Sequence, residues 1–194
     1  MKTVITGRSA ITAMNMDEVI FKLGEPIRHI RFVHDLGKVA VAGIGLLMND
    51  AAIRFPVKNS DISIYIGIDD AIEEIKERYF NGILDEGILG VSPLFFPYTS
   101  PNAFVSQAAI AFDIRGESIV MPCRSSYRNA VQYADVCIRG GYTKMAVTGG
   151  LISEGRKTDA GENNYKAEFF FLEDREDAVK RGARIYQELS GRLV

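Results

Sequence analysis

The alternation of two residue periodicities along the chain constrains its fold more than any other feature. Short runs rich in β-branched residues predict strands, and they are separated by segments in which apolar residues recur every three or four positions, as in amphipathic helices. This alternation is typical of an α/β sheet, and several strand-like runs are apolar on both faces, as strands covered by helices on both sides must be. The predicted strands are residues 2–7, 38–47, 62–68, 118–122 and 144–150, and the predicted helices are residues 69–83, 101–112, 126–139 and 173–181.

The last quarter of the chain ends this alternation with one more unit. Residues 151–166 are polar and lack periodicity, which predicts a surface excursion. An apolar run at 167–174 then predicts a strand, followed by a short helix and a final strand. No internal repeat or linker divides the sequence, and 194 residues suit one compact core. We therefore predict a single domain over residues 1–194.

The charge balance excludes two classes of partner. The chain has 23 Lys and Arg residues against 25 Asp and Glu residues, and its isoelectric point is near 5.8. Without surplus positive charge, nucleic acid and membrane surfaces are poor partners. The first eleven residues do not resemble a signal peptide, and no 18 apolar residues run without a charge. The two cysteines, Cys123 and Cys137, show no C-x-x-C spacing, so we expect a cytoplasmic protein.

Two clusters of titratable residues are interpreted as structural. Four carboxylates fall in the first turns of the helix predicted at 69–83, where they favour the helix dipole, and capping accounts for them better than a metal site does. Two histidines lie among charged residues early in the chain, which indicates a solvated basic loop. We therefore expect no metal and no cofactor. These residues are Asp69, Asp70, Glu73 and Glu74, and His29 and His34 with Arg28, Arg31 and Asp35.

An ordered series of short motifs covers almost the whole chain. It combines a Ser-Pro-x-x-Phe-Pro run, then Pro-Asn-Ala, Arg-Gly, Gly-Gly, and Leu-Glu-Asp before Arg-Gly-Ala-Arg-Ile-Tyr. In this order the motifs resemble the β-ketoacyl synthase family from its first strand to its midpoint. The segments are "VITGRSAI", "GILGVSPLFFPYTSPNAF", "AIAFDIRGESIV", "AVQYADVCIRGG", "MAVTGG" and "AEFFFLEDREDAVKRGARIYQELSGR".

This resemblance implies a fold and an interface. The fold implied is one αβα half of a thiolase-like domain, with a central mixed sheet of about five strands. The segment "SIVMP" would be the strand that pairs antiparallel with its counterpart in a second subunit, which makes Ser118, Ile119, Val120 and Met121 interface residues. The helix predicted at 101–112 carries Asn102 and a run of small side chains, and close packing there suits a subunit interface as well as a core. The glycine pairs at 140–141 and 149–150 are expected to supply turns at the ends of a helix and a strand.

The resemblance also implies a nucleophilic cysteine at a helix amino terminus directly after this strand. Counting back from the glycines at 149–150 places Arg124 at that position, and counting forward from residues 115–116 places Ser125 there. Cys123 lies one or two residues earlier, so a local shift is needed to bring its sulfur to the helix tip. A small apolar filler is the commoner role for such a cysteine. Cys137 falls inside the helix on its apolar side and is expected to be buried.

The functional interpretation leaves three alternatives open. The family uses two histidines from its carboxy-terminal half, and this sequence reaches Val194 before that half, so complete condensation by the chain alone is not expected. The first interpretation is a non-catalytic accessory subunit that pairs with a full-length ketosynthase in fatty acid, polyketide or aryl-polyene biosynthesis, with an acyl carrier protein as a further candidate partner. The second is a minimal acyl transferase or condensing enzyme that uses Cys123 or Ser125. The third is a homodimeric acyl-binding module.

Overall fold

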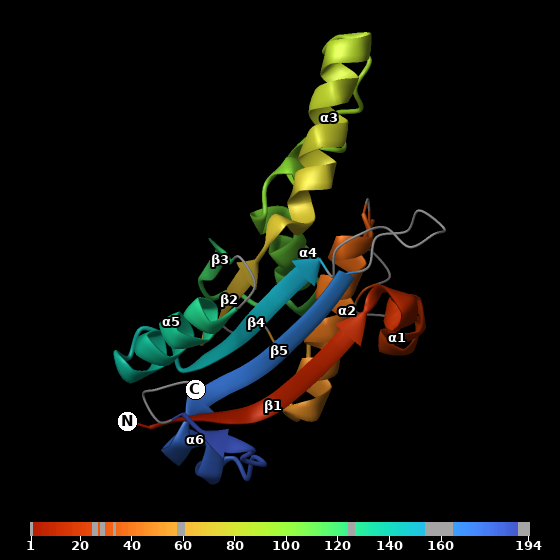
Figure 1. Ribbon diagram of the computed structural model, residues 1–194. Helices are drawn as coiled ribbons and strands as arrows, with labels where there is room; N and C mark the ends of the chain where they lie inside the picture. The colour runs from red at the N-terminus through yellow and green to blue at the C-terminus, as the bar shows by residue number, and fades with distance from the viewer. Residues whose placement is uncertain are drawn as a thin grey trace.

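The structure is a computed structural model that describes residues 2–24, 27, 30–32, 34–57, 61–123, 127–153 and 165–189. Its helices and strands alternate along most of the chain (Figure 1). The elements are β1 (Thr3–Thr12), η1 (Ala13–Asn15), α1 (Met16–Leu23), α2 (Asp35–Asp50), β2 (Ile62–Ile68), η3 (Asp70–Ile72), α3 (Glu73–Glu86), η4 (Phe96–Thr99), α4 (Asn102–Phe112), β3 (Ser118–Pro122), α5 (Arg128–Arg139), β4 (Met145–Ser153), β5 (Tyr165–Asp174), α6 (Arg175–Lys180) and β6 (Gln187–Glu188).

One six-stranded mixed sheet organises the molecule, with the strand order β3-β2-β4-β5-β1-β6. Strands β3, β2 and β4 are parallel, whereas β5 runs antiparallel to both β4 and β1, and β6 runs antiparallel to β1. The predicted α/β fold with a mixed sheet is therefore confirmed. The sheet has one strand more than the expected five, and the final strand predicted after the last helix is β6, which is only two residues long.

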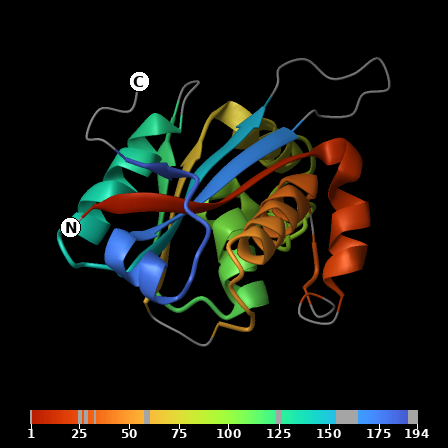
Figure 2. The ribbon, with the colours of Figure 1, turned by 90° about the horizontal axis from the view of Figure 1, so that it is seen from below.

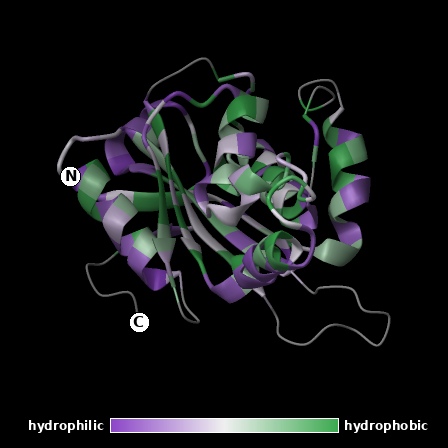
Figure 3. Cartoon of the chain, turned by 90° about the horizontal axis from the view of Figure 1, so that it is seen from above, coloured by the Kyte–Doolittle hydropathy of each residue, from purple (hydrophilic) through white to green (hydrophobic). Residues whose placement is uncertain are grey.

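Helices cover both faces of this sheet, as the apolar strands required. Helix α5 packs on one face, and α2 and α4 pack on the other, with α1 outside α2 (Figure 2). Every residue of β2 is buried. Its side chains alternate between two cores, since Ile64 and Ile66 face α2 whereas Tyr65 faces α5. Coloured by hydropathy, the central strands are largely hydrophobic between the more polar outer faces of the helices (Figure 3).

The segment predicted as a strand at residues 38–47 is instead part of the helix α2. Its β-branched residues suggested a strand, but α2 lies between the sheet, α1 and α4, so most of its circumference is buried and it has no polar stripe to show a helical period. Gly43 permits the close contact with the sheet, because a Cβ there would lie 2.6 Å from the ring of Phe169. Short apolar runs of this kind cannot be assigned from periodicity alone.

A projecting arm extends from the sheet at the carboxyl end of β2. We define the arm as α3 together with the return segment 87–99, and Figure 1 shows α3 running well beyond the sheet. Asp69 has the capping role predicted for it: it caps η3, the turn that leads into the arm, and its carboxylate accepts backbone N–H groups from Ala71 (3.0 Å) and Ser153 (2.9 Å). Several large apolar side chains of the arm are exposed, namely Phe80, Leu84, Ile88, Leu89, Leu94 and Phe96.

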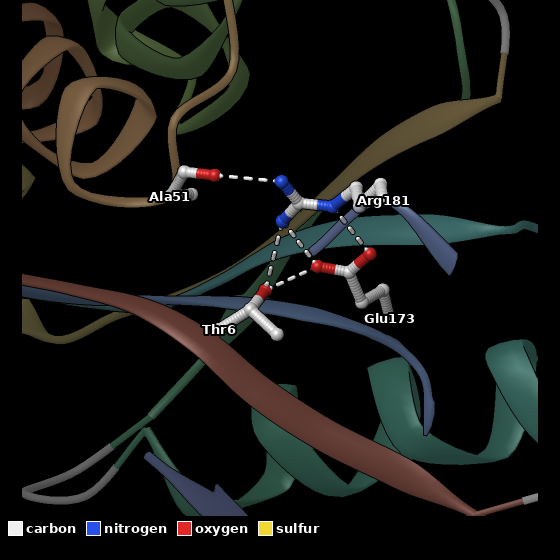
Figure 4. A network of polar contacts seen from close by, with 4 residues as sticks. All are labelled: Thr6, Ala51, Glu173 and Arg181. Carbon is white, nitrogen blue, oxygen red and sulfur yellow. Dashed lines mark hydrogen bonds and ion pairs between the residues drawn. The ribbon is translucent and has the colours of Figure 1, made fainter. Parts of the chain in front are cut away.

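A buried ion pair joins the last helix to the sheet and to α2. Glu173 is 1% exposed and accepts hydrogen bonds from the guanidinium of Arg181, including one of 2.8 Å from Nε, and from the hydroxyl of Thr6 (Figure 4). The same guanidinium donates to the carbonyl of Ala51 at 3.0 Å. A buried carboxylate needs such partners, so this network connects α6, β1, β5 and the end of α2.

No helix among the described residues is long and apolar enough to cross a bilayer.

Candidate functional site

The candidate site lies where the parallel strands β3, β2 and β4 end. Cys123 follows β3 directly, and its backbone N–H donates to the carbonyl of Ile68 at 2.7 Å. Its side chain is buried, with 9% of the residue exposed. Helix α5 begins only at Arg128, so Cys123 precedes its first residue by five positions. Arg124 and Ser125, the two other residues predicted for the nucleophile position, lie outside the described residues.

The environment of Cys123 opposes thiolate formation. Burial raises the pKa of the Cys123 thiol, and the nearby carboxylates of Asp69 and Asp70 raise it further. A nucleophilic cysteine needs the opposite, namely a cation or a helix dipole that lowers its pKa. The described surroundings of Cys123 therefore keep the sulfur protonated at neutral pH.

Tyr127, the residue before α5, packs over a flat surface that we call the glycine niche. The niche consists of Gly67 on β2, Gly150 on β4 and Glu168 on β5, which are cross-strand partners in one row of the sheet. A Cβ at Gly150 would lie 2.7 Å from the Tyr127 ring, and a Cβ at Gly67 would lie 3.1 Å from the Tyr127 Cα and 3.2 Å from the sulfur of Cys123. Both glycines are therefore needed for the close approach of Tyr127 to the strands.

The Tyr127 hydroxyl closes the niche by donating a short hydrogen bond to the carboxylate of Glu168. Its ring also lies against Phe170, with 5.9 Å between the ring centroids. Burial raises the pKa of Tyr127, and the hydrogen bond and negative charge of Glu168 raise it further, so the phenol remains a neutral donor. The carboxylate of Glu168 is therefore already paired with Tyr127, whose ring covers Gly150. The protonated thiol of Cys123 lies against Gly67.

The structure corrects one sequence interpretation here and explains what was missed. Gly149 and Gly150 do not form a turn at a strand end, because both lie within β4. Gly149 has a φ of +136°, and a Cβ there would lie 2.0 Å from the carbonyl oxygen of Glu168, so the position requires glycine. Tyr127, Gly67 and Glu168 were not singled out. The available signal was the charge of Glu168 inside the apolar run of β5, although nothing local identifies its partner 41 positions away.

The other glycine pair and the second cysteine are found as predicted. Gly140 is the cap of α5, and Gly141 has a φ of +73°, which is the left-handed conformation expected after a helix. Cys137 is buried on the inner face of α5, in the core with Tyr65 and Ile138.

Strand β3 forms one edge of the sheet and contains four of the predicted interface residues. The N–H of Ile64 donates to the carbonyl of Glu117 at 2.7 Å, and the N–H of Cys123 donates to Ile68. Because backbone groups in a strand alternate sides, residues 119, 121 and 123 bond to β2, and residues 118, 120 and 122 face away from it. Pro122 fits this pattern, since proline is tolerated where an edge strand has no hydrogen bond to donate. The edge is formed by Ser118, Ile119, Val120, Met121 and Pro122.

Asn102 and His34 lie apart from the glycine niche. Asn102 is exposed at the first position of α4, after the proline that caps the helix. His34 is not in a solvated loop, as the sequence had suggested, but caps α2: its Nδ1 accepts the N–H of Leu36 at 3.1 Å, and its ring contacts Phe104 and Tyr165. Burial lowers the pKa of His34, which favours the neutral ring. His29 lies outside the described residues.

No set of metal ligands accompanies these residues. In the part of the chain that the structure describes, no group of three or more His, Cys, Asp or Glu side chains is placed to hold a metal ion.

Comparison with known proteins identifies the fold. No protein-family model and no curated protein matches the sequence. Among solved structures, the chain is similar to a chain in the structure of a type II polyketide synthase acyl carrier protein in complex with its ketosynthase. The TM-score is 0.68 and the sequence identity is 20%, and the alignment covers 97% of this chain and 67% of the other chain. The chain has a ketosynthase fold.

Two further solved structures agree with this assignment. The ishigamide ketosynthase/chain length factor matches with a TM-score of 0.69 and 18% identity over 97% of this chain and 62% of that one. A β-ketoacyl synthase from Burkholderia phymatum matches with a TM-score of 0.69 and 18% identity over 96% of this chain and 62% of that one. The chain thus spans about two thirds or less of the length of these ketosynthase-fold structures.

Proposed function

We propose that this protein is a ketosynthase-like accessory subunit of fatty acid, polyketide or aryl-polyene biosynthesis. In this role the chain acts as a single cytoplasmic domain, is not catalytic by itself, and pairs with a full-length β-ketoacyl synthase. The observation that carries the proposal is the position of β3, an edge strand of a ketosynthase fold with outward-facing backbone groups at residues 118 and 120.

The chemistry of this edge supports pairing with another sheet. An edge strand with outward-facing N–H and C=O groups is a template for another strand, and proteins usually block or cover such edges. Ile119, Val120 and Met121 are half-buried and hydrophobic, so they combine hydrogen-bonding backbone with apolar surface. A partner with the same fold offers a matching strand. The ishigamide structure, whose title pairs a ketosynthase with a chain length factor, makes a ketosynthase the first partner to test.

The state of Cys123 supports the non-catalytic part of the proposal. A buried thiol with a raised pKa is a poor acyl acceptor, and its sulfur packs against Gly67 together with the Cα and Cβ of Tyr127. The minimal acyl transferase that uses Cys123 is therefore less well supported than the accessory subunit. An acyl carrier protein remains a second partner to test, because one of the similar structures is a ketosynthase in complex with such a protein.

Affinity purification from the native host tests the pairing. The tagged protein is purified gently, and stoichiometric companions are identified by mass spectrometry. We expect a full-length ketosynthase, and we expect Val120→Pro to abolish its recovery, because proline removes an outward-facing N–H from the free edge. Ser118→Glu, which adds a charge to the same edge, should weaken recovery.

The opposite edge of the sheet supplies the control. Gln187→Glu places the same charge on the exposed strand β6 and should leave recovery unchanged. Circular dichroism confirms that each variant is folded. Recovery of a lone homodimer, or equal recovery with the Ser118 and Gln187 variants, would contradict the accessory-subunit proposal. Stoichiometric acylation of Cys123 by an acyl-coenzyme A donor would contradict its non-catalytic part.

A further inference from the structure

The arm contains a cavity that is separate from the β3 edge and from the glycine niche. It has a volume of about 230 Å³ and lies between α3 and the return segment. This volume is below the usual range for drug-sized ligands, roughly 300–1,000 Å³, so the cavity suits a smaller molecule. Gly82 and Gly90 bring the two sides of the arm together, since a Cβ at Gly82 would lie 3.3 Å from Val91 and a Cβ at Gly90 would lie 2.4 Å from the Cβ of Glu86.

The walls of this arm cavity combine apolar side chains with the polar side chains of Arg78, Glu86 and Ser92. Tyr79 and Phe95 contribute aromatic rings, and Ile75 and Val91 contribute aliphatic side chains. Binding sites for small molecules commonly combine such walls with a few polar groups that set the orientation of the ligand. An aromatic ligand body therefore matches this cavity better than a sugar or another highly hydroxylated body does.

Two opposite charges line the cavity at different heights of α3. Arg78 and Glu86 are eight positions apart, which corresponds to about 12 Å along a helix. The guanidinium of Arg78 lies over the ring of Phe95, with 5.4 Å between Cζ and the ring centroid, and this contact leaves its N–H groups able to bind an anion. An anionic ligand is attracted to Arg78 and repelled by Glu86 in the arm cavity and by Glu74 in the smaller cavity beside Arg78, so its charged end is directed to Arg78 itself.

The neighbourhood of Arg78 does not add a second strong cation. A smaller cavity adjoins Arg78 and Phe95 and is lined also by His34 and Glu74. Burial lowers the pKa of His34, so its ring is neutral at neutral pH. Lys76 also belongs to α3, but it pairs with Glu73 at 2.7 Å and does not line the cavity. Recognition of an anion in the arm cavity is therefore assigned to Arg78 alone.

We propose that the arm cavity binds a small aromatic carboxylate, with the ring between Tyr79 and Phe95 and the carboxylate on Arg78. This inference does not depend on pairing through β3, so either proposal can fail without the other.

Titration calorimetry with trans-cinnamate at neutral pH tests this proposal on the intact chain. We expect a Kd on the order of 0.1–1 mM, which is reasonable for a ligand of this size. Cinnamyl alcohol, which has the same ring without the charge, should bind at least about tenfold more weakly, because it lacks the charge-assisted hydrogen bond to Arg78. This ligand comparison requires no variant and so does not depend on the folding of a mutant.

Paired variants of α3 locate the site. Arg78→Gln should weaken cinnamate binding by about 10- to 100-fold, whereas Lys76→Gln, which removes the same charge two positions before Arg78 and three before Tyr79, should leave it unchanged. Equal binding of acid and alcohol, equal effects of the two variants, or no heat of binding up to 10-fold above the expected Kd range would overturn the proposal.

Discussion

The sheet body and the arm differ in how far their large apolar side chains are buried. In the body, most leucines, isoleucines and phenylalanines of α2, β2 and β5 are almost completely buried. In the arm, Leu84 is 80% exposed and Leu89 is 98% exposed. Because the free energy of burial follows the area removed from water, identical side chains should stabilise the body strongly and the arm hardly at all.

The buried ion pair of the body gives the largest expected effect. Arg181→Met leaves the carboxylate of Glu173 buried without its charged partner, and we expect a loss of about 3–5 kcal/mol in the free energy of unfolding. Urea denaturation measures it. The double variant Glu173→Gln with Arg181→Met should recover part of that loss, because no buried charge remains. A loss below 1 kcal/mol in the single variant would show that water reaches Glu173.

A matched pair of leucines compares the two regions directly. Leu47→Ala in α2 removes a fully buried side chain and should cost about 2–5 kcal/mol, whereas Leu84→Ala in α3 should change stability by less than about 0.5 kcal/mol. Thermal and urea unfolding of both variants check the difference. Similar losses would mean that the arm is covered in solution, for example by a second copy of the chain, and the sedimentation of the protein would then show an oligomer.

Removing the Tyr127 hydroxyl separates its hydrogen bond from its packing. Tyr127→Phe keeps the ring over Gly150 but removes the hydroxyl that donates to Glu168, and we expect a loss of about 1.5–3 kcal/mol because the acceptor is charged. Tyr142→Phe alters an exposed tyrosine and should be neutral within about 0.5 kcal/mol. Equal unfolding midpoints for the two variants would argue against a stabilising contact with Glu168.

The smallest expected effect concerns pH and His34, at the junction of the body and the arm. Burial lowers the pKa of His34 in the folded state, so the unfolded chain binds more protons near pH 6, and stability should fall as the pH drops below about 6.5. His34→Asn keeps a side-chain acceptor for the N–H of Leu36 but cannot titrate. The decrease in stability between pH 7.5 and 5.5 should therefore be smaller in this variant than in the natural chain. An identical decrease would place His34 in solvent.

The sequence predicted the sheet well where strands and helices differ in pattern. The runs at 62–68 and 118–122 coincide with β2 and β3, and the helix predicted at 101–112 differs from α4 by one residue. It failed at α2, because burial around most of the helix removes the polar stripe that marks helical periodicity. Helix α1 was not predicted, although it is amphipathic, since its eight residues are few for a periodicity argument.

Some features of the candidate site could likewise be predicted from local sequence patterns, and others could not. Cys123 could be placed beside the end of a strand, and Cys137 on the inner face of a helix, because both positions follow from local pattern. The glycine niche could not be predicted, because it depends on the register that aligns Gly67, Gly150 and Glu168 across three strands. The position of His34 against Phe104 and Tyr165 likewise joins segments that are far apart in the chain.

The sequence by itself therefore determined the alternating α/β architecture, the burial of its central strands and the resemblance to ketosynthases. Those properties depend on periodicity and on the order of short motifs, which are local. Only the tertiary structure decided that Tyr127 packs against Gly67 and Gly150, that β3 is an edge, and that several large apolar side chains of the arm remain exposed. The physical reason is that strand register and the packing of one element on another depend on contacts between residues distant in sequence, and side-chain burial, charge pairing and pKa follow from those contacts.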